Sequence, residues 1–449
     1  MQSQIISSAK MLVATFTITG NKKTKGYIIE RECTFKIGDS LSFPEFVEKC
    51  KRSKEFILSS GLFIIADVTP ELLPNGNLNV LIDVKERLYL FPLPYFKIAE
   101  RNFNVWLNDE KASLKRVNFG AKLKWYNFSG RKDVVDFEAY TGFNQLVSAT
   151  YRQPYATGAL TWGYAVGFNA GRTKQVFAFT SNNQPIIYPT IKGDIFNKTF
   201  FSAYLDFTYR KGLRENHAIY TRFSKEHISD SLYNINNNYY GVGVKNVNYF
   251  DVTYRYAFVN IDYAPYPLRG TTFTAAVFKR SFAPTLNMLQ ISVATFNGVP
   301  LGKKWYYLNN SAVTIRSKNN LAYINVGFMG YGGFYLRGLD RLVVDGSQGF
   351  VIKNTLVKEV LNTRFKIPIK AKFIKAHQKL PLRIMCNTFN DYGYVNNPNA
   401  GNSKLNNKML YTYGVGVDFL AAYDFLLKVQ YSANQLNQQG VFIQAGLNF

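Results

Sequence analysis

One arginine stands out in this sequence because its immediate neighbours cannot satisfy its charge. Residues 330–342 read GYGGFYLRGLDRL, in which three glycines lead into Leu336, Arg337, Gly338 and Leu339, with the aromatic residues Phe334 and Tyr335 directly before them. Glycines at this density let a backbone fold back on itself at positive φ. A guanidinium held between apolar side chains needs a carboxylate or several other acceptors. We therefore expect a long loop that turns inward and holds Arg337 against a fixed acidic partner.

The other reactive side chains form no catalytic or metal-binding pattern. The three histidines are too dispersed for a metal or triad site, and the cysteines lack zinc-ligand spacing: His217, His227, His377, Cys33, Cys50 and Cys386. The nearest approach to a nucleophile elbow, residues 345–349 (DGSQG), lacks the first glycine of Gly-x-Ser-x-Gly. A phosphate-binding Gly-Lys-Ser/Thr loop is also missing from the sequence. The sequence therefore predicts a protein that is not an enzyme and uses no metal or other cofactor.

The cysteines leave two alternatives open. Cys33 and Cys50 would pair if their two segments pack together, whereas unpaired, buried thiols are the simpler interpretation. Three cysteines in a chain of this length do not make a disulfide framework.

Length and composition favour a membrane protein built from strands. The 449 residues allow one large domain with a small one, or two to three ordinary domains. The sequence contains no run of about 18 apolar residues, the length of a transmembrane helix. Aromatic residues nevertheless make up 16% of the chain, with 31 Tyr and 37 Phe. That content is typical of a barrel with aromatic girdles at both membrane interfaces.

The net charge of +25 raises the question of a nucleic-acid partner. Residues 1–100 carry 13 Lys and Arg and 11 Asp and Glu, a net +2, which leaves 41 − 18 = +23 for the remainder. These charges are scattered singly, with no basic helix or dense run, so we expect no nucleic-acid binding. Two interpretations stay open: a composition bias, or attraction to anionic lipid head groups or an acidic passenger.

Apolar and polar residues alternate with period two from about residue 102 to the end. In residues 201–210 the odd positions are Phe, Ala, Leu, Phe and Tyr, and residues 135–140 and 427–432 alternate likewise. An apolar face toward lipid and a polar face toward a water-filled lumen is typical of a transmembrane barrel strand. A soluble β-sandwich also alternates, but it would not need so many long strands. Residues 102–449 are thus predicted to form a transmembrane antiparallel β-barrel of about 16 strands.

The first 91 residues predict a small α/β unit with the element order βααββ. A strand at 11–19 is followed by helices at about 24–33 and 42–60 and by strands at 62–68 and 78–86. A Pro-Asn-Gly turn joins the last two strands. Residues 92–101 are expected to be a stiff hinge, because Pro92 and Pro94 lie close together at its start.

With these elements in place, the Arg337 loop resembles the Arg-Gly-Phe motif of the BamA/Sam-type family of outer-membrane assembly and translocation barrels. Leu339 stands where that family usually has phenylalanine. Residues 262–272 (DYAPYPLRGTT) are similar to the family's Asp…Pro-x-x-Gly strand signature. The N-terminal unit resembles the family's polypeptide-transport-associated (POTRA) repeat in residues 18–24, 61–63 and 84–87.

The resemblance assigns partners to the loop. Residues 389–393 (FNDYG) resemble the Phe-x-Asp-x-Gly motif, whose aspartate faces the lumen and receives the loop arginine, which implies a role for Asp391 with Gly393. A second strand, residues 356–366, is similar to a family strand with an inward glutamate, here Glu359. Five strand-like segments follow the loop, as in the 16-stranded family barrel: 351–367, 381–395, 408–421, 424–433 and 440–449.

The last segment, GVFIQAGLNF, resembles the terminal-strand signal of outer-membrane barrels in Leu447 and Phe449. The resemblance implies a protein that inserts barrel precursors into the outer membrane or translocates polypeptides, through a weak seam between first and last strands. The first strand is expected at about 103–107. The alternatives are a passive channel or porin, and a secretion transporter for one dedicated passenger.

The resemblance also implies partners and a location. Outer-membrane lipid and unfolded or nascent polypeptide clients are expected, with accessory subunits of an assembly complex as a further class of partner. The first ten residues, MQSQIISSAK, lack the basic and apolar regions of a secretory signal. A mature bacterial outer-membrane protein is expected, with a mitochondrial or plastid outer membrane as the alternative.

Overall fold

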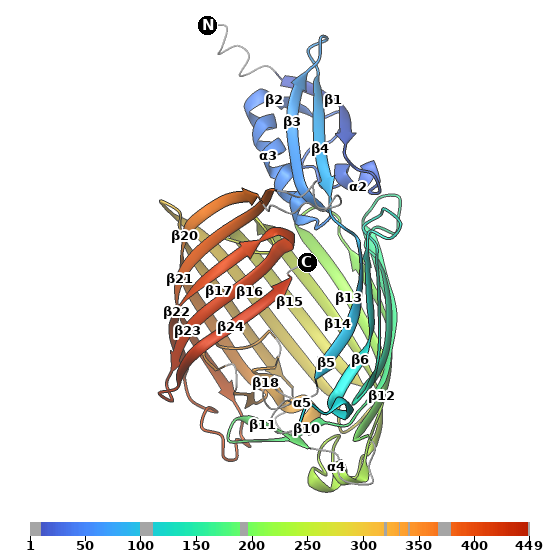
Figure 1. The fold of residues 1–449 in the computed structure, drawn as a ribbon, viewed down its shortest axis with the longest axis vertical. Coiled ribbons are helices and arrows are strands. Elements are labelled where there is room, and N and C mark those ends of the chain that lie inside the picture. The colour runs from blue at the N-terminus through green and yellow to red at the C-terminus, as the bar shows by residue number, and fades with distance from the viewer. Residues whose placement is uncertain are drawn as a thin grey trace.

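The computed structural model describes residues 10–98, 111–188, 196–317, 321–331, 333–339, 342–366 and 379–447. An N-terminal α/β unit stands at one end of a large β-barrel (Figure 1). We call this end of the barrel proximal and the opposite end distal. The elements of the N-terminal unit are β1 (Lys10–Thr19), α2 (Gly26–Glu30), β2 (Ser40–Ser42), α3 (Phe43–Ser59), β3 (Phe63–Leu72) and β4 (Leu78–Glu86).

The N-terminal unit forms a four-stranded sheet in the order β2-β1-β4-β3, in which β1 and β4 run parallel. Its core is apolar and almost fully buried, with Val13, Phe46, Ile57, Leu78 and Ile82 at 0–1% exposure. The element order agrees with the predicted one except for the short strand β2, which three residues are too few to reveal. Within the described residues, no helix is both long and apolar enough to cross a membrane.

The barrel is a single 16-stranded sheet, in which each strand pairs antiparallel with its neighbour in the order β24-β23-β22-β21-β20-β17-β16-β15-β14-β13-β12-β9-β8-β7-β6-β5. The 16-stranded fold predicted from the period-two pattern is therefore confirmed. Its strands are β5 (Leu90–Ile98), β6 (Val117–Tyr126), β7 (Val134–Gly142), β8 (Gln145–Gln153), β9 (Trp162–Thr173), β12 (Lys198–Tyr209), β13 (Glu215–Ile228), β14 (Asn246–Ile261), β15 (Gly270–Ser281), β16 (Met288–Gly302), β17 (Trp305–Arg316), β20 (Gln348–Lys366), β21 (Lys379–Asn396), β22 (Leu410–Ala421), β23 (Phe425–Asn434) and β24 (Gln439–Leu447).

The outer face of the sheet is mostly apolar. Phe201, Leu205 and Phe207 of β12 and Phe223 of β13 are 42–43% exposed, whereas Ser202 between them is buried toward the lumen. An apolar surface of this extent around a polar interior is the surface of a barrel that spans a membrane.

Two prolines that we predicted to stiffen a hinge lie instead in the first barrel strand. β5 pairs with β6 from Leu90 opposite Trp125 to Ile98 opposite Val117. The hinge predicted for residues 92–101 is therefore wrong over its described part, 92–98. A proline is tolerated at a sheet edge, where its missing N–H is not needed by a neighbour. The first strand expected at 103–107 lies outside the described residues.

Smaller elements gather at the distal end of the barrel (Figure 1). They include a short helix whose N-cap, Ser229, accepts a hydrogen bond from the N–H of Leu232 (3.2 Å). The elements are β10 (Val176–Ser181), β11 (Gln184–Tyr188), α4 (Asp230–Ile235), α5 (Tyr323–Val326), β18 (Gly327–Met329) and β19 (Val344–Asp345). Two 3₁₀ turns complete the described elements: η2 (Leu114–Arg116) directly before β6, and η4 (Ala422–Asp424) between β22 and β23.

Candidate functional site: a braced lumen loop and an open seam

The segment between β18 and β19 folds into the barrel, as the glycine pattern predicts. Gly330 and Gly338 have φ values of +90° and +82°, which residues with side chains rarely adopt. Leu336 and Leu339 are buried at 0% and 4% exposure. They join a cluster of apolar side chains that includes Val351 and Val395 on the inner wall. The leucines hold the loop against the wall by burial of apolar surface.

The structure brings Arg337 to Asp391. Arg337 Nε donates to Asp391 Oδ2 (2.8 Å), Nη2 donates to Oδ1, and the Arg337 backbone N–H donates to Oδ2 (3.2 Å). Nη1 also donates to Thr355 Oγ1 (2.9 Å), and the guanidinium lies 4.0 Å from the ring centroid of Phe389. The Asp391 side chain is 0% exposed. A bidentate, charge-assisted pair at this depth fixes both the position and the orientation of the loop.

Two glycines allow the loop to approach the wall this closely. A Cβ on Gly393 would lie 2.9 Å from Met329 Cε and 3.0 Å from Leu336 Cδ1, and a Cβ on Gly338 would lie 2.9 Å from Ser432 Oγ. The Gly338 carbonyl accepts a hydrogen bond from Asn434 Nδ2 (2.9 Å). The loop is thus pressed onto β21 and β23, and β23 is the direct neighbour of the last strand.

Glu359 does not meet the loop arginine in the described structure. Its carboxylate accepts instead from Arg383 Nε (2.8 Å) and Nη2 (2.6 Å). Glu359 lies four residues beyond Thr355 on β20, which is about 13 Å along a strand. The prediction that Glu359 is a partner of the loop is therefore wrong, because the inward-facing motif residue is too far toward the proximal end.

The predicted terminal-strand residues are only partly described. The backbone of Leu447 pairs with Phe425 at the end of β24, whereas Phe449 lies outside the described residues. Their role as a signal stays a prediction.

A second arginine, which sequence analysis did not single out, holds the base of the loop. Arg316 at the end of β17 donates to the carbonyls of Asn325 (2.8 Å), Gly327 (2.8 Å) and Gly346 (3.0 Å). These acceptors are backbone atoms on both sides of the inward segment. No sequence signal marks an arginine whose partners are carbonyl groups.

A buried ionic contact ties the N-terminal unit to the barrel. Arg210, just after β12, donates through Nη1 to Glu32 Oε1 (3.0 Å), and Tyr155 donates to the same oxygen (2.6 Å). Lys132 Nζ lies 4.0 Å away from it. Burial raises the pKa of Glu32, but the charges of Arg210 and Lys132 and the hydrogen bonds outweigh burial and lower the pKa to about 2. Glu32 is therefore ionised whenever the unit is docked near neutral pH.

The two predicted cysteine alternatives are resolved. Cys33 and Cys50 are free and buried, and Cys386 is exposed. Burial raises the pKa of the Cys33 and Cys50 thiols to about 12, so both are un-ionised near neutral pH.

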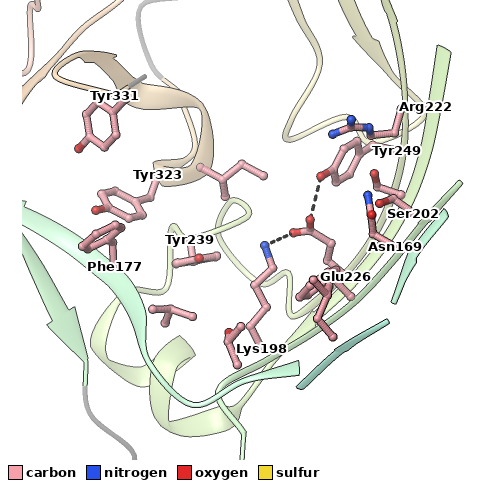
Figure 2. Close-up of a pocket in the computed structure, with 17 residues that line it drawn as sticks. Asn169, Phe177, Lys198, Ser202, Arg222, Glu226, Tyr239, Tyr249, Tyr323 and Tyr331 are labelled. Carbon is pink, nitrogen blue, oxygen red and sulfur yellow. Dashed lines mark hydrogen bonds and ion pairs between the residues drawn. The ribbon is translucent and has the colours of Figure 1, made fainter. Parts of the chain in front are cut away.

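The distal half of the lumen contains a cavity of about 730 Å³, which Figure 2 shows in close-up. Glu226 stands in its wall and accepts hydrogen bonds from Lys198 (2.7 Å), Tyr249 (2.9 Å) and Tyr240 (2.7 Å). Asn169, Ser202 and Arg222 also line the cavity, so this part of its wall is polar. The cavity is therefore suited to water and passing polar groups.

The barrel sheet ends at β5 and β24, and no ladder joins these two strands in the described residues. Figure 1 shows β24 in red and β5 in blue at the two borders of the sheet. Unsatisfied backbone groups in lipid cost several kcal/mol each. We call this open border the seam.

The two borders of the seam differ in the groups that they offer. The Tyr126 N–H donates to the Tyr89 carbonyl (2.7 Å). The backbone groups of the odd-numbered residues of β5 therefore point to β6. Because these groups alternate along an antiparallel strand, the even-numbered residues of β5 face the seam. Pro92 and Pro94 are among them, so the β5 border lacks two N–H donors.

The β24 border has no such gap. The Asn434 N–H donates to the Gln438 carbonyl (3.0 Å), so the odd-numbered residues from Gln439 to Leu447 point their backbone groups at the seam. None of these residues is proline. β24 therefore presents an unbroken series of backbone donors and acceptors to the seam.

No family model and no curated protein matches this chain. Among solved structures it is similar to BamA from Haemophilus ducreyi lacking POTRA domains 1–3, with a TM-score of 0.52 and 12% sequence identity over 97% of this chain and 83% of that chain. The chain has the fold of a BamA-type barrel. The similarity to CdiB from Acinetobacter baumannii has a TM-score of 0.48 and 12% identity over 97% and 74% of the two chains. CdiB from Escherichia coli has a TM-score of 0.47 and 8% identity over 97% and 90%.

The fold implied by the sequence resemblance is thereby confirmed. The similarity rests on shape, since an identity of 12% is too low to transfer the role of any single residue. The roles of Arg337, Asp391 and Gly393 therefore follow from the contacts of this chain alone.

Proposed function

We propose that this protein is an outer-membrane barrel that inserts β-barrel precursors into the membrane, or moves polypeptides across it, at the seam between β5 and β24. The observation that carries the proposal is the unequal seam. A barrel border that keeps every donor and acceptor on one side and lacks two donors on the other is poorly suited to close on itself. It is well suited to accept a strand from another chain.

The proposed mechanism is β-augmentation on β24. An incoming strand satisfies the free N–H and C=O groups of β24 and so replaces the missing neighbour. Each pairing lowers the cost of unsatisfied backbone groups in lipid. The mechanism contains no catalytic step and needs no cofactor.

The braced loop supports this mechanism by keeping the wall behind β24 rigid. Arg337 is fixed on Asp391 of β21, and Gly338 contacts Ser432 and Asn434 of β23. β23 in turn pairs with β24 over its whole length, from Phe425 opposite Leu447 to Ala433 opposite Gln439. A template strand that is held in one position can guide an incoming strand into one register.

The N-terminal unit is proposed to act as a POTRA-type docking domain for unfolded clients. The described sheet of this unit ends at β3, so one edge of β3 has no neighbouring strand there. Support also comes from the BamA comparison, which covers 97% of this chain and so extends beyond the barrel. Accessory subunits would bind to this unit as well, since it projects from the proximal end (Figure 1).

A passive channel is the second candidate, and the lumen cavity of about 730 Å³ favours it. A passive channel predicts steady solute conductance without a bound polypeptide. The inward loop and the docked N-terminal unit both restrict the lumen, which weighs against this candidate. A secretion transporter for one dedicated passenger would use the same seam or lumen and differs only in its client.

A crosslink across the seam tests the proposal. Phe96→Cys on β5 and Val441→Cys on β24, in a Cys386→Ser background, would be joined by bis-maleimides of graded length. The matched control joins Val441→Cys to Tyr431→Cys, which already lie opposite each other in the β23–β24 ladder. Both proteins would be reconstituted in liposomes and supplied with a urea-denatured eight-stranded barrel protein as probe.

We expect the seam crosslink to abolish protease-protected insertion of the probe, whereas the control crosslink leaves insertion intact. Unchanged insertion after complete crosslinking of the seam would contradict the proposal and favour the passive channel.

A further inference from the structure

A row of polar side chains crosses the outer wall of the barrel. On β17, Leu308 is 9% exposed and faces the lumen, whereas Tyr307 is 39% exposed and faces outward, together with Asn309 two residues on. Ladder pairing places the other members of the row directly beside Asn309. We call the following five residues, each opposite the next, the carboxamide row: Thr271, Asn297, Asn309, Asn354 and Asn390.

The carboxamide row lies within the apolar surface of the barrel. On β17, Trp305 and Tyr307 lie on the proximal side of Asn309, and Val313 and Ile315 lie on its distal side, all of them exposed. Polar side chains in the hydrocarbon region of a membrane are costly and need partners. Water is not available there to satisfy them.

The members of the row satisfy one another only in part. Asn309 Nδ2 donates to Asn354 Oδ1 (2.9 Å), and Asn354 Nδ2 donates to Asn390 Oδ1 (3.1 Å). Thr271 Oγ1 donates to Asn297 Oδ1 (3.0 Å), and Ser311 Oγ donates to Asn309 Oδ1 (3.0 Å). Every carboxamide oxygen of the row therefore accepts at least one hydrogen bond.

Donors and acceptors nevertheless remain. A carboxamide has two N–H donors and two lone pairs on its oxygen. Among the described residues, Asn297 and Asn390 side chains donate no hydrogen bond, and Asn309 and Asn354 each donate one. The oxygens of Asn297, Asn309 and Asn390 each keep a second lone pair. The row carries no charge, so it does not call for an ionic partner.

We propose that the carboxamide row is the surface through which two copies of this chain associate side by side in the membrane. A row that offers both N–H donors and oxygen acceptors is complementary to itself. Two copies related by a two-fold axis can therefore pair the donors of one row with the acceptors of the other. Hydrogen bonds and close packing are what drive such association in lipid.

The row lies several strands away from the seam. β17 and β20, which carry Asn309 and Asn354, stand five and four places from β24 in the strand order. Association through the row therefore leaves the seam of each copy open to lipid. The inference goes beyond the proposed function and depends only on the barrel lying in a membrane.

Cysteine crosslinking in liposomes tests the inference on the full chain. In a Cys386→Ser background, Val313→Cys reports contact between copies near the row. Phe223→Cys on β13 reports contact between copies on a more distant part of the wall. These two positions are closely matched, at 40% and 43% exposure. A short bis-maleimide should give dimers from Val313→Cys and at least tenfold less dimer from Phe223→Cys.

The row itself is tested by Asn309→Leu/Asn354→Leu, with Thr221→Leu on the outer face of β13 as the control. We expect roughly tenfold or greater loss of Val313→Cys dimers in the double variant, because several intermolecular hydrogen bonds are removed, and no loss in the control. If the double variant does not fold, Asn390→Leu at the end of the row provides a milder test of the same loss.

Three results would overturn the inference. The first is that Val313→Cys gives no more dimer than Phe223→Cys. The second is that the leucine variants still dimerise fully. Crosslinking of Val313→Cys in native membranes to a different protein, with none between copies, would show that the row serves another partner.

Discussion

Replacing Glu32 by glutamine should release the N-terminal unit from the barrel. Glu32 is 3% exposed, and its carboxylate faces Arg210, Tyr155 and Lys132. Its pKa falls from 4.5 to about 2 in the folded protein. A difference of about 2.5 units corresponds to roughly 3 kcal/mol of preference for the ionised form. Glu32→Gln keeps the size of the side chain but removes its charge. It leaves the half-buried Arg210 beside Lys132 without a counter-ion.

We therefore expect an undocked population that is on the order of 100-fold larger in Glu32→Gln. Hydrogen–deuterium exchange would measure it, because the Lys25 N–H donates across the interface to the Gly130 carbonyl (3.0 Å) and should lose protection. Glu30→Gln, at the exposed last residue of α2 and two residues before Glu32, is the matched control. Equal protection in the two variants would refute the reasoning.

The same pair of groups predicts a pH dependence. The pKa of Glu32 is lower in the folded than in the unfolded state, so its stabilising contribution is fully present above about pH 4.5. The contribution is lost as the pH falls from about 4.5 toward about 2. Wild-type protein should therefore lose protection at Lys25 over this window, and Glu32→Gln should show no such step.

Three further predictions concern the loop and the seam. Asp391→Asn leaves Arg337 buried without a counter-charge and should destabilise the loop by about 3–5 kcal/mol, measured as faster proteolysis within residues 330–346, whereas Thr355→Val should cost less because it removes one neutral acceptor. Gly393→Ala should lower the free energy of unfolding by about 1 kcal/mol, because its Cβ would meet the side-chain ends of Met329 and Leu336, which must shift. Thermal unfolding measures the loss, and a variant as stable as the wild type would show that the loop is not pressed onto β21. Pro92→Ala/Pro94→Ala restores two N–H donors at the β5 border, so it should stabilise a closed seam and slow probe insertion, and faster insertion would contradict the assignment of that border.

The sequence could predict the elements whose signals are local. Period-two alternation marked the barrel, and the spacing of the five segments after the loop placed β20 to β24 within a few residues. Arg337 was identifiable from its glycine-rich surroundings, and Asp391 from the resemblance of residues 389–393 to a family motif. The roles of Leu447 and Phe449 stay predictions.

The parts that sequence analysis missed depend on contacts between distant residues. Glu32 and Arg210 lie 178 residues apart, and neither has a neighbour that marks it as half of an ion pair. Two closely spaced prolines such as Pro92 and Pro94 are compatible with a hinge and with an edge strand, so the sequence alone does not separate the two. The carboxamide row exists only through ladder register, since its members come from five different strands and each looks like an isolated polar residue.

The central claim is that an incoming polypeptide pairs with the free border of β24. The most direct measurement is a disulfide scan between single cysteines at positions 440–445 of β24 and single cysteines along one strand of a denatured barrel probe, in a Cys386→Ser background. We predict efficient bonds in one antiparallel register with a two-residue period, and few bonds from Asn169→Cys on the lumen wall. Bonds from the lumen position alone, or bonds from β24 without any period, would contradict pairing at the seam.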